Sequence, residues 1–274
     1  MIEIHIDADD ADIYVNVDNE DMKLRQSFIV EAMTNALALL NETNTKAVIF
    51  VVAKDLEQNV KYQILLKQFL NDGHAIGNHS YSHSESFHRW NREPQTRDIE
   101  LAHKVISETL NYKSIYFRGP GYSSSHAIQE SLLKMGYLYD CTKIPLVYST
   151  VLDLYFKINK NRNKSFPNIL RLSDLYFSLA NPIPGIKELP IHPKKIWGIP
   201  IYSTWIFQNK NRRQYFLKLI EKTQRPFLFH AIDFLDYSSN KSKIPALRIE
   251  SIERFEVIRK IFIGLKSRDK SIIE

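Results

Sequence analysis

KAVIFVVAKDLEQNVKYQILLKQFLNDGHAIGNHS, residues 46–80, reads as a strand, a helix and a second strand in succession. In residues 46–53, Lys46 is followed by an uninterrupted apolar run rich in β-branched side chains, which is typical of a strand buried on both faces. Residues 58–73 repeat apolar side chains at helical spacing and end at Gly73, the residue type that most often follows the last turn of a helix. Residues 75–80 predict the second strand. This spacing indicates a βαβ unit with parallel strands.

The same alternation extends in both directions along the chain. Near the N-terminus, isoleucines alternate with polar side chains over residues 2–8, which predicts a strand and places Asp7 and Asp9 on one of its faces. Further strands are predicted at residues 114–120, 137–142 and 226–234, and further helices at residues 27–43, 96–111, 126–136, 212–223 and 248–266. The sequence therefore predicts an α/β fold whose parallel sheet is closed or nearly closed into a barrel.

Residues 145–210 interrupt this regularity. They hold most of the prolines of the chain, and they predict extended segments and loops rather than a separate domain. With 274 residues and 44% hydrophobic content, the chain can bury one large core. We therefore expect a single domain over residues 1–274, with an irregular proline-rich insert at residues 145–210.

Composition limits the compartment and the partners. The chain has one cysteine, Cys141, so an intramolecular disulfide is excluded and a reducing compartment is favoured. We expect Cys141 to be a small buried apolar side chain. No apolar run is long enough to span a bilayer, and the first ten residues do not read as a signal peptide, so we expect a cytoplasmic protein. The net charge of +6 permits an anionic partner. Basic clusters such as residues 157–164 lack the interleaved aromatic side chains that stack bases, so we expect no nucleic acid. These clusters are either ordinary solvated faces or a peripheral contact with the anionic inner face of a membrane.

Two histidines four residues apart lie where the strand predicted at residues 75–80 ends: His79 is near its end and His83 is just beyond it. Nine histidines in 274 residues make such a spacing common by chance, so the pair alone is compatible with a metal site or with two exposed side chains. Other ionisable residues lie at the ends of other predicted strands. In a parallel α/β barrel these ends converge, so we expect the residues to cluster in space.

Five motifs in order, HIDADD, GNHSYSH, FRGPGYS, GYLYDCT and PFLFHAID, resemble the polysaccharide deacetylases, the NodB-homology or carbohydrate esterase 4 family. The resemblance covers residues 2 to about 236. It implies a distorted (β/α) barrel with about seven parallel strands, one zinc-type divalent ion per chain, and hydrolysis of an N-acyl group from an amino sugar.

The resemblance also implies a ligand set and a base. The metal ligands would be Asp9, His79 and His83, and this set of one carboxylate and two imidazoles leaves a position open for water, as a catalytic zinc requires. Asp7 matches the base that takes a proton from the attacking water. The rival assignment, which makes Asp9 the base and Asp10 the ligand, stays open because the family glycine after the paired aspartates is absent.

The resemblance also assigns roles to Arg118 and to the turn that follows it. Arg118 matches the arginine that pairs with the base and keeps it ionised. Pro120, Gly121 and Tyr122 match a substrate-binding turn, in which the backbone N–H of Gly121 or Tyr122 would donate to the oxyanion.

His230 matches the acid that protonates the leaving amine. Asp140 or Asp233 would orient it, and the sequence does not distinguish them.

The family implies a substrate class but not the substrate. The N-acetyl or N-formyl group would be removed from an amino sugar of a bacterial glycan, or from its lipid-carrier-linked or nucleotide-linked precursor. Two alternatives are a catalytically silent barrel that binds carbohydrate or protein, and an amidohydrolase acting on a small cyclic amide.

Overall fold

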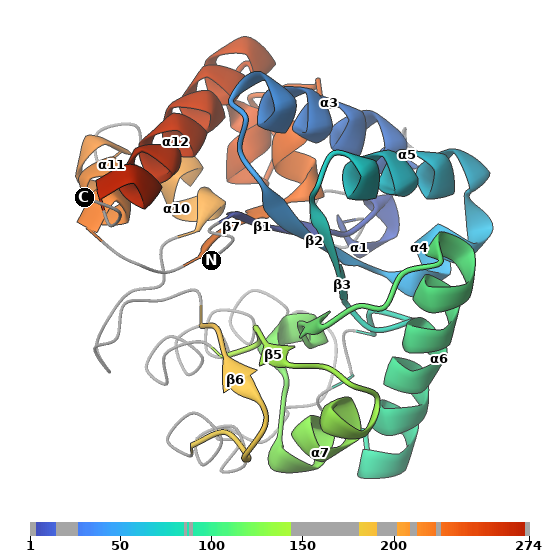
Figure 1. Ribbon diagram of the computed structural model, residues 1–274. Helices are drawn as coiled ribbons and strands as arrows, with labels where there is room; N and C mark the ends of the chain where they lie inside the picture. Colours follow the sequence, from blue (N-terminus) through green and yellow to red (C-terminus); the bar gives the residue numbers. More distant parts are fainter. Residues whose placement is uncertain are drawn as a thin grey trace, which may run out of the picture.

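The computed structural model describes residues 4–14, 27–84, 87, 90–143, 181–190, 202–208, 213–222 and 226–271. In this part of the chain seven parallel strands form one sheet in the order β6-β5-β4-β3-β2-β1-β7. The strands are β1 (Ile4–Ala8), β2 (Ala47–Val51), β3 (Ala75–Asn78), β4 (Tyr116–Phe117), β5 (Tyr139–Asp140), β6 (Lys187–Glu188) and β7 (Phe227–His230). The sheet curls into a half-barrel surrounded by helices, which confirms the predicted fold class (Figure 1).

Helices connect and cover the strands. They are α1 (Ala11–Tyr14), α3 (Ile29–Glu42), α4 (Ala53–Gln58), α5 (Val60–Asn71), α6 (Arg92–Leu110), α7 (His126–Lys134), α10 (Ser203–Gln208), α11 (Arg213–Lys222) and α12 (Ser251–Ser271). Three short 3₁₀ helices are η2 (Pro120–Tyr122), η4 (Ala231–Phe234) and η5 (Pro245–Arg248). Neighbouring helices contact one another in the order α12, α3, α5, α6 and α7. This order follows that of the strands across the sheet from β7 to β5.

Local sequence signals set several helix ends. The Asn59 side chain accepts the Tyr62 N–H at the start of α5, and the Ser125 hydroxyl accepts the Ile128 N–H at the start of α7. Gly73 has a φ of 82°, and the N–H that follows it, of His74, bonds to the Phe69 carbonyl. This is a Schellman ending of α5, as Gly73 predicted.

The two faces of the sheet have different surroundings. On β1, Ile4 and Ile6 pack in the large apolar core under the surrounding helices. On β2, Val48 and Phe50 belong to a smaller interior cluster that also contains Cys141. His5 and Asp7 alternate with the isoleucines of β1 and are buried as well, so the interior of the half-barrel holds ionisable side chains.

The structure departs from the sequence prediction at several short elements. Residues 11–14 form helix α1, which was not predicted, and the strand predicted at residues 226–234 ends at His230, where η4 follows. Residues 53–58 form the short helix α4, whereas we expected a helix only from residue 58. Helix α10 lies inside the region 145–210, for which only extended segments and loops were predicted. Strands β4 and β5 contain two residues each, which is shorter than predicted. Most of the insert, at residues 145–180, 191–201 and 209–210, lies outside the described residues.

The expected membrane contact depends on the basic clusters. Residues 157–164 lie outside the described part. Arg213, from a second cluster, is buried and forms an ion pair with Glu253 at 2.9 Å. Its charge is therefore paired within the protein. Among the helices that the structure describes, none has the length and apolarity required to cross a bilayer.

Candidate metal and catalytic site

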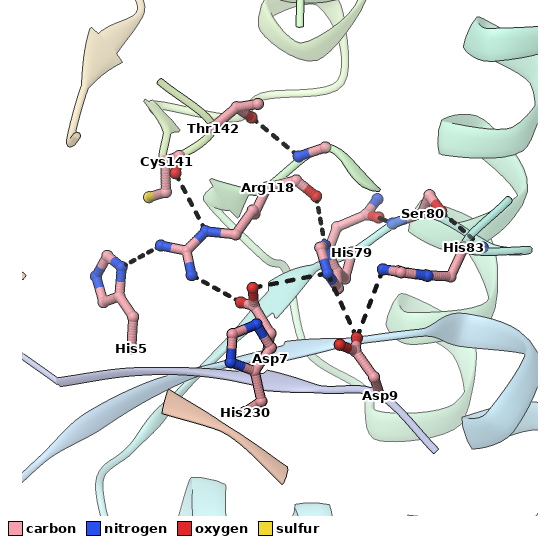
Figure 2. A network of polar contacts seen from close by, with 12 residues as sticks. His5, Asp7, Asp9, His79, Ser80, His83, Arg118, Cys141, Thr142 and His230 are labelled. Atoms are coloured by element: carbon pink, nitrogen blue, oxygen red, sulfur yellow. Dashed lines mark hydrogen bonds and ion pairs between the residues drawn. The ribbon is translucent and has the colours of Figure 1, made fainter. Parts of the chain in front are cut away.

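Three of the predicted site residues converge at the carboxyl ends of β1 and β3. Asp9 Oδ1 lies 3.5 Å from His79 Nε2 and 3.6 Å from His83 Nε2. Each residue offers one ligand atom, and these atoms all lie within 4.8 Å of one another. Figure 2 shows both imidazoles directed at the Asp9 carboxylate. In the described part of the chain, this is the one cluster of three such side chains that could hold a metal ion.

His79 is held in a defined orientation. Its backbone N–H donates to the Val51 carbonyl of β2, and its Nδ1 lies 2.7 Å from the Arg118 carbonyl oxygen. Because a carbonyl accepts only, Nδ1 carries the proton and Nε2 presents a lone pair to the site. This arrangement is the one that metal-binding histidines use to fix their tautomer.

The loop that carries His83 has two residues in the left-handed backbone region, Ser80 with a φ of 66° and His83 with a φ of 45°. Such a conformation costs roughly 1 kcal/mol or more for each residue other than glycine. Side chains stabilise it locally: Asn78 Oδ1 accepts the Ser80 N–H, and Ser80 Oγ accepts the His83 N–H. Asp98 of α6 accepts the backbone N–H groups of Tyr81 and Ser82. These hydrogen bonds therefore stabilise the loop conformation that positions His83 next to Asp9.

The cluster fits a divalent cation. Asp9 is 4% exposed, and its Oδ1 accepts no hydrogen bond from a described residue, although it lies between two imidazoles. Burial raises the pKa of Asp9, so a buried carboxylate there needs a positive partner. Burial lowers the pKa of both His79 and His83, which keeps the imidazoles neutral as metal ligands must be.

Asp10 lies beside this cluster but is occupied elsewhere. Its Oδ1 accepts the backbone N–H groups of Ala11, Phe28 and Ile29, and its Oδ2 accepts the Ser27 hydroxyl. It thereby satisfies donors at the start of α3. The rival assignment of Asp10 as the ligand would require these bonds to be given up, so the geometry favours Asp9.

Asp7 lies at the end of β1 and pairs with Arg118 beyond β4. The Arg118 Nη1 donates to Asp7 Oδ1 at 2.7 Å, and both side chains are buried. Burial raises the pKa of Asp7, but the Arg118 charge, together with His79 and His230, outweighs it, so the pKa falls below its ordinary value. Asp7 Oδ2 lies 3.9 Å from His79 Nε2 and so faces the metal cluster. The pairing expected from the motifs is present.

Arg118 has three further partners that the motifs did not predict. Its Nε donates to the Cys141 carbonyl at 3.1 Å, its Nη2 lies 2.7 Å from His5 Nδ1, and its guanidinium carbon lies 4.2 Å from the centre of the Phe50 ring. His5 is absent from the predicted site. The one signal for it was its place two residues before Asp7, on the same face of β1.

The predicted substrate-binding turn is η2, and glycine is required beside it. A Cβ on Gly119 would lie 1.9 Å from the Ser123 carbonyl oxygen, so no other residue fits there. Pro120 is buried, whereas Gly121 is exposed and has a φ of 57°. A Cβ placed on Gly121 would have no atom of a described residue within 4 Å. The Tyr122 N–H donates to the Gly119 carbonyl. Of the two N–H groups proposed as oxyanion donors, the geometry therefore favours that of Gly121.

His230 ends β7, and a hydrogen-bond pair with Asp233 fixes it. The His230 N–H donates to Asp233 Oδ2 at 2.8 Å, and the Asp233 N–H donates to the His230 side chain. Burial raises the pKa of Asp233, with the His230 charge opposing this. Asp233 therefore positions His230 through the backbone, as the capping partner of η4.

Asp140 serves a different part of the structure. Its Oδ2 accepts from the Ser124 hydroxyl at 2.7 Å and from Gln129 Nε2 at 3.2 Å, and its Oδ1 accepts the Thr142 N–H. These contacts tie the end of β5 to the segment after η2. Of the two aspartates that the sequence offered as partners of His230, only Asp233 is bonded to it in the described structure.

Comparison with known proteins supports the family that the motifs indicated. Residues 6–139 match the polysaccharide deacetylase family. A peptidoglycan-N-acetylglucosamine deacetylase of Bacillus cereus is 28% identical over 91 residues, which are 33% of this chain. The matched region spans about one third of that relative, 32% of its length.

The fold is shared with a solved structure. A crystal structure from Mycobacterium smegmatis, assigned to the polysaccharide deacetylases, superimposes with a TM-score of 0.56 at 13% identity. The superposition covers 94% of this chain and 82% of the other. The NodB-type (β/α) barrel and the resemblance to the polysaccharide deacetylases are thus both confirmed.

Proposed function

We propose that this chain, whose residues 6–139 match the polysaccharide deacetylase family, is a metal-dependent hydrolase that removes an N-acyl group from an amino sugar. The observation that carries the proposal is the placement of the metal cluster, the Asp7–Arg118 pair and His230 at one end of a single sheet. An acid, a base and a site for a cation are the parts that amide hydrolysis requires.

Asp9, His79 and His83 would hold one zinc-like ion. When bound, such an ion would activate a water molecule and polarise the acyl oxygen. The support is the buried Asp9 oxygen, to which no described residue donates a hydrogen bond, and the two imidazole nitrogens that face it. Oxygen and nitrogen ligands in a set of three suit zinc and related divalent metals.

Asp7 would act as the general base. It is ionised, because Arg118 lowers its pKa, and its Oδ2 faces the metal cluster, 3.9 Å from His79 Nε2. There it would accept the proton of the water that attacks the acyl carbon. Arg118 would hold the carboxylate in place and keep it ionised until it accepts this proton.

His230 would act as the general acid. It lies beside Asp7 across the β1–β7 pair, and Asp233 fixes the backbone that carries it. As the carbon–nitrogen bond breaks, its imidazole would protonate the leaving amine, and the Gly121 N–H would stabilise the negative charge on the acyl oxygen. The catalytically silent alternative predicts the loss of a base or a ligand, and the described site retains both.

For the substrate, we propose an N-acetylated amino sugar of a glycan or of its lipid-linked or nucleotide-linked precursor. The support is the B. cereus relative, whose name states N-acetylglucosamine in peptidoglycan. The test is acetate release by the zinc-loaded full chain from an N-acetylglucosamine tetramer, from peptidoglycan and from UDP-N-acetylglucosamine. A metal-dependent release from one of these is expected. No release from any of them, with a full complement of metal, would contradict the proposal.

A further inference from the structure

The guanidinium of Arg118 is enclosed on three sides inside the half-barrel. Nε points at the Cys141 carbonyl, Nη1 at Asp7 and Nη2 at His5 (Figure 2). The flat face of the guanidinium lies over the Phe50 ring. Arg118 and His5 are both 0% exposed. Water therefore cannot replace any of these partners, and each one fixes the direction of one edge of the guanidinium.

His5 can be only an acceptor toward Arg118. Arginine has N–H donors and no acceptor, so the contact of 2.7 Å from Nη2 to Nδ1 requires a lone pair on Nδ1 and a proton on Nε2. Burial lowers the pKa of His5 well below its usual value, and the Arg118 charge lowers it further. His5 is thus a neutral imidazole in one tautomer, and Nε2 has no hydrogen-bond partner among the described residues.

If residue 5 served only to fill the core, a histidine would be an unfavourable residue there. A buried imidazole with an unpaired N–H costs free energy that an apolar side chain would avoid. Its neighbours in register on β2 and β7, Val48 and Leu228, are both apolar and fully buried. A histidine at this position is explained by the acceptor that it supplies to Arg118.

We propose that His5 is a positioning residue, whose Nδ1 accepts the Arg118 Nη2–H and so holds the guanidinium against the Asp7 carboxylate. His5 acts through Arg118, and Arg118 acts on the residue that we propose as the base. The kinetic test of this inference rests on the proposed function, whereas the spectroscopic test of the His5 tautomer does not.

The kinetic test compares three substitutions at residue 5 with one at residue 48. Asparagine has an acceptor oxygen at the place of Nδ1, so His5→Asn keeps the bond. His5→Gln moves the acceptor by one carbon, and His5→Leu removes it while filling the space. Val48→Ala is the matched control, because it disturbs the packing beside His5 without changing a hydrogen bond. Each zinc-loaded variant is assayed on the N-acetylglucosamine tetramer.

We expect His5→Leu and His5→Gln to lower kcat by about 10- to 100-fold with KM changed by less than about threefold, since small misplacements of catalytic groups have effects of this size. His5→Asn should recover kcat to within about threefold of the parent protein, and Val48→Ala should keep it. All variants should retain the metal. Equal kcat in His5→Asn and His5→Gln, or equal losses in His5→Leu and Val48→Ala, would overturn the proposal. If His5→Leu does not fold, the first comparison still decides.

A spectroscopic test separates this inference from the proposed function. Two-bond ¹H–¹⁵N correlation spectra distinguish the histidine tautomers, and the His5 signal is identified by its absence in His5→Asn. We expect the tautomer protonated on Nε2, with a shift of the Nδ1 signal when Arg118→Met removes the donor. An Nδ1-protonated or doubly protonated His5 would overturn the proposal even if the enzyme is active. If the parent protein releases no acetate, the proposed function fails and these spectra alone decide on His5.

Discussion

Asp7 on β1 and His230 on β7 are register partners across two neighbouring parallel strands, so the proposed base and the proposed acid lie side by side in the sheet. Their separation is set by backbone pairing rather than by a flexible loop. On the other side of β1, the metal cluster follows β3, and Asp9 joins it two residues after Asp7. One strand therefore places the base between the proposed acid and the proposed metal ligands.

The ligand assignment predicts opposite results for two adjacent aspartates. Asp9→Ala should remove the single zinc-like ion that we expect, as should His79→Ala and His83→Ala. Asp10→Ala should keep the ion and lower the free energy of unfolding by about 0.5–2 kcal/mol, because the donors at the start of α3 lose their acceptor. Elemental analysis and urea unfolding measure the two effects. Metal loss in Asp10→Ala with retention in Asp9→Ala would show that the assignment is reversed.

Removing the proposed base should abolish most of the activity and leave the metal in place. Asp7→Asn keeps the shape of the side chain but accepts a proton poorly, so kcat should fall by about 10²- to 10⁴-fold. The measurement is acetate release together with metal content. Turnover near that of the parent protein would eliminate Asp7 as the base, whatever the metal content.

The proposed acid and its partner should differ in the size of their effects. His230→Ala should lower kcat by about 10²- to 10⁴-fold with the metal retained. Asp233→Asn should cost about tenfold or less, because an amide oxygen can still accept the His230 N–H. Acetate release from the zinc-loaded variants measures both. Equal losses would indicate that Asp233 has a direct chemical role instead.

Because of His74, we expect the free energy of unfolding to depend on pH in a mildly acidic range. Burial first, and then the Lys46 charge, lower its pKa from the ordinary value of 6.5 to about 4, and its Nδ1 accepts the Ala47 N–H. Between these two pH values the unfolded chain binds a proton that the folded chain does not. Stability contributed by His74 is therefore complete above pH 6.5, falls as the pH drops toward about 4, and falls no further below that.

The measurement is urea unfolding of the parent protein and of His74→Asn at several pH values. The asparagine oxygen can still accept the Ala47 N–H but does not titrate. In this window the parent protein should lose stability more steeply than the variant, by less than about 1.4 kcal/mol per pH unit. Parallel curves would contradict the lowered pKa.

Arg254 on α12 should be a main determinant of the stability of the segment after β7. It is fully buried, and its guanidinium donates to the carbonyl oxygens of Asp233, Leu235, Tyr237, Ala246 and Ile249. Arg254→Met would leave buried carbonyls without donors and should lower the free energy of unfolding by about 3–5 kcal/mol. Arg259→Ala, on the same helix, removes exposed ion pairs with Glu42 and Glu256 and should cost less than about 1 kcal/mol. Similar losses in urea unfolding would contradict this role.

Much of the fold could be predicted from local patterns. A few consecutive residues were enough to predict the apolar run of β2, the helical spacing and final glycine of α5, and the alternation of β1. This is because side-chain burial repeats every two residues in a strand and about every 3.6 residues in a helix. The motifs also named the polar residues at the strand ends, including Asp9, His79 and His83. What these patterns underestimated were short elements such as α4 and α10, which have too few turns for a clear period.

By itself, the sequence determined the βαβ alternation, the family resemblance and most of the residues that we propose for the site. Only the tertiary structure decided that Asp10 serves the start of α3, that the Tyr122 N–H is already bonded, and that Asp140 supports β5 rather than His230. Arg118 meets Asp7 and His5 across 111 and 113 residues of sequence. No local period encodes such a contact, because strand pairing brings these residues together and the direction of each side chain then selects its partner.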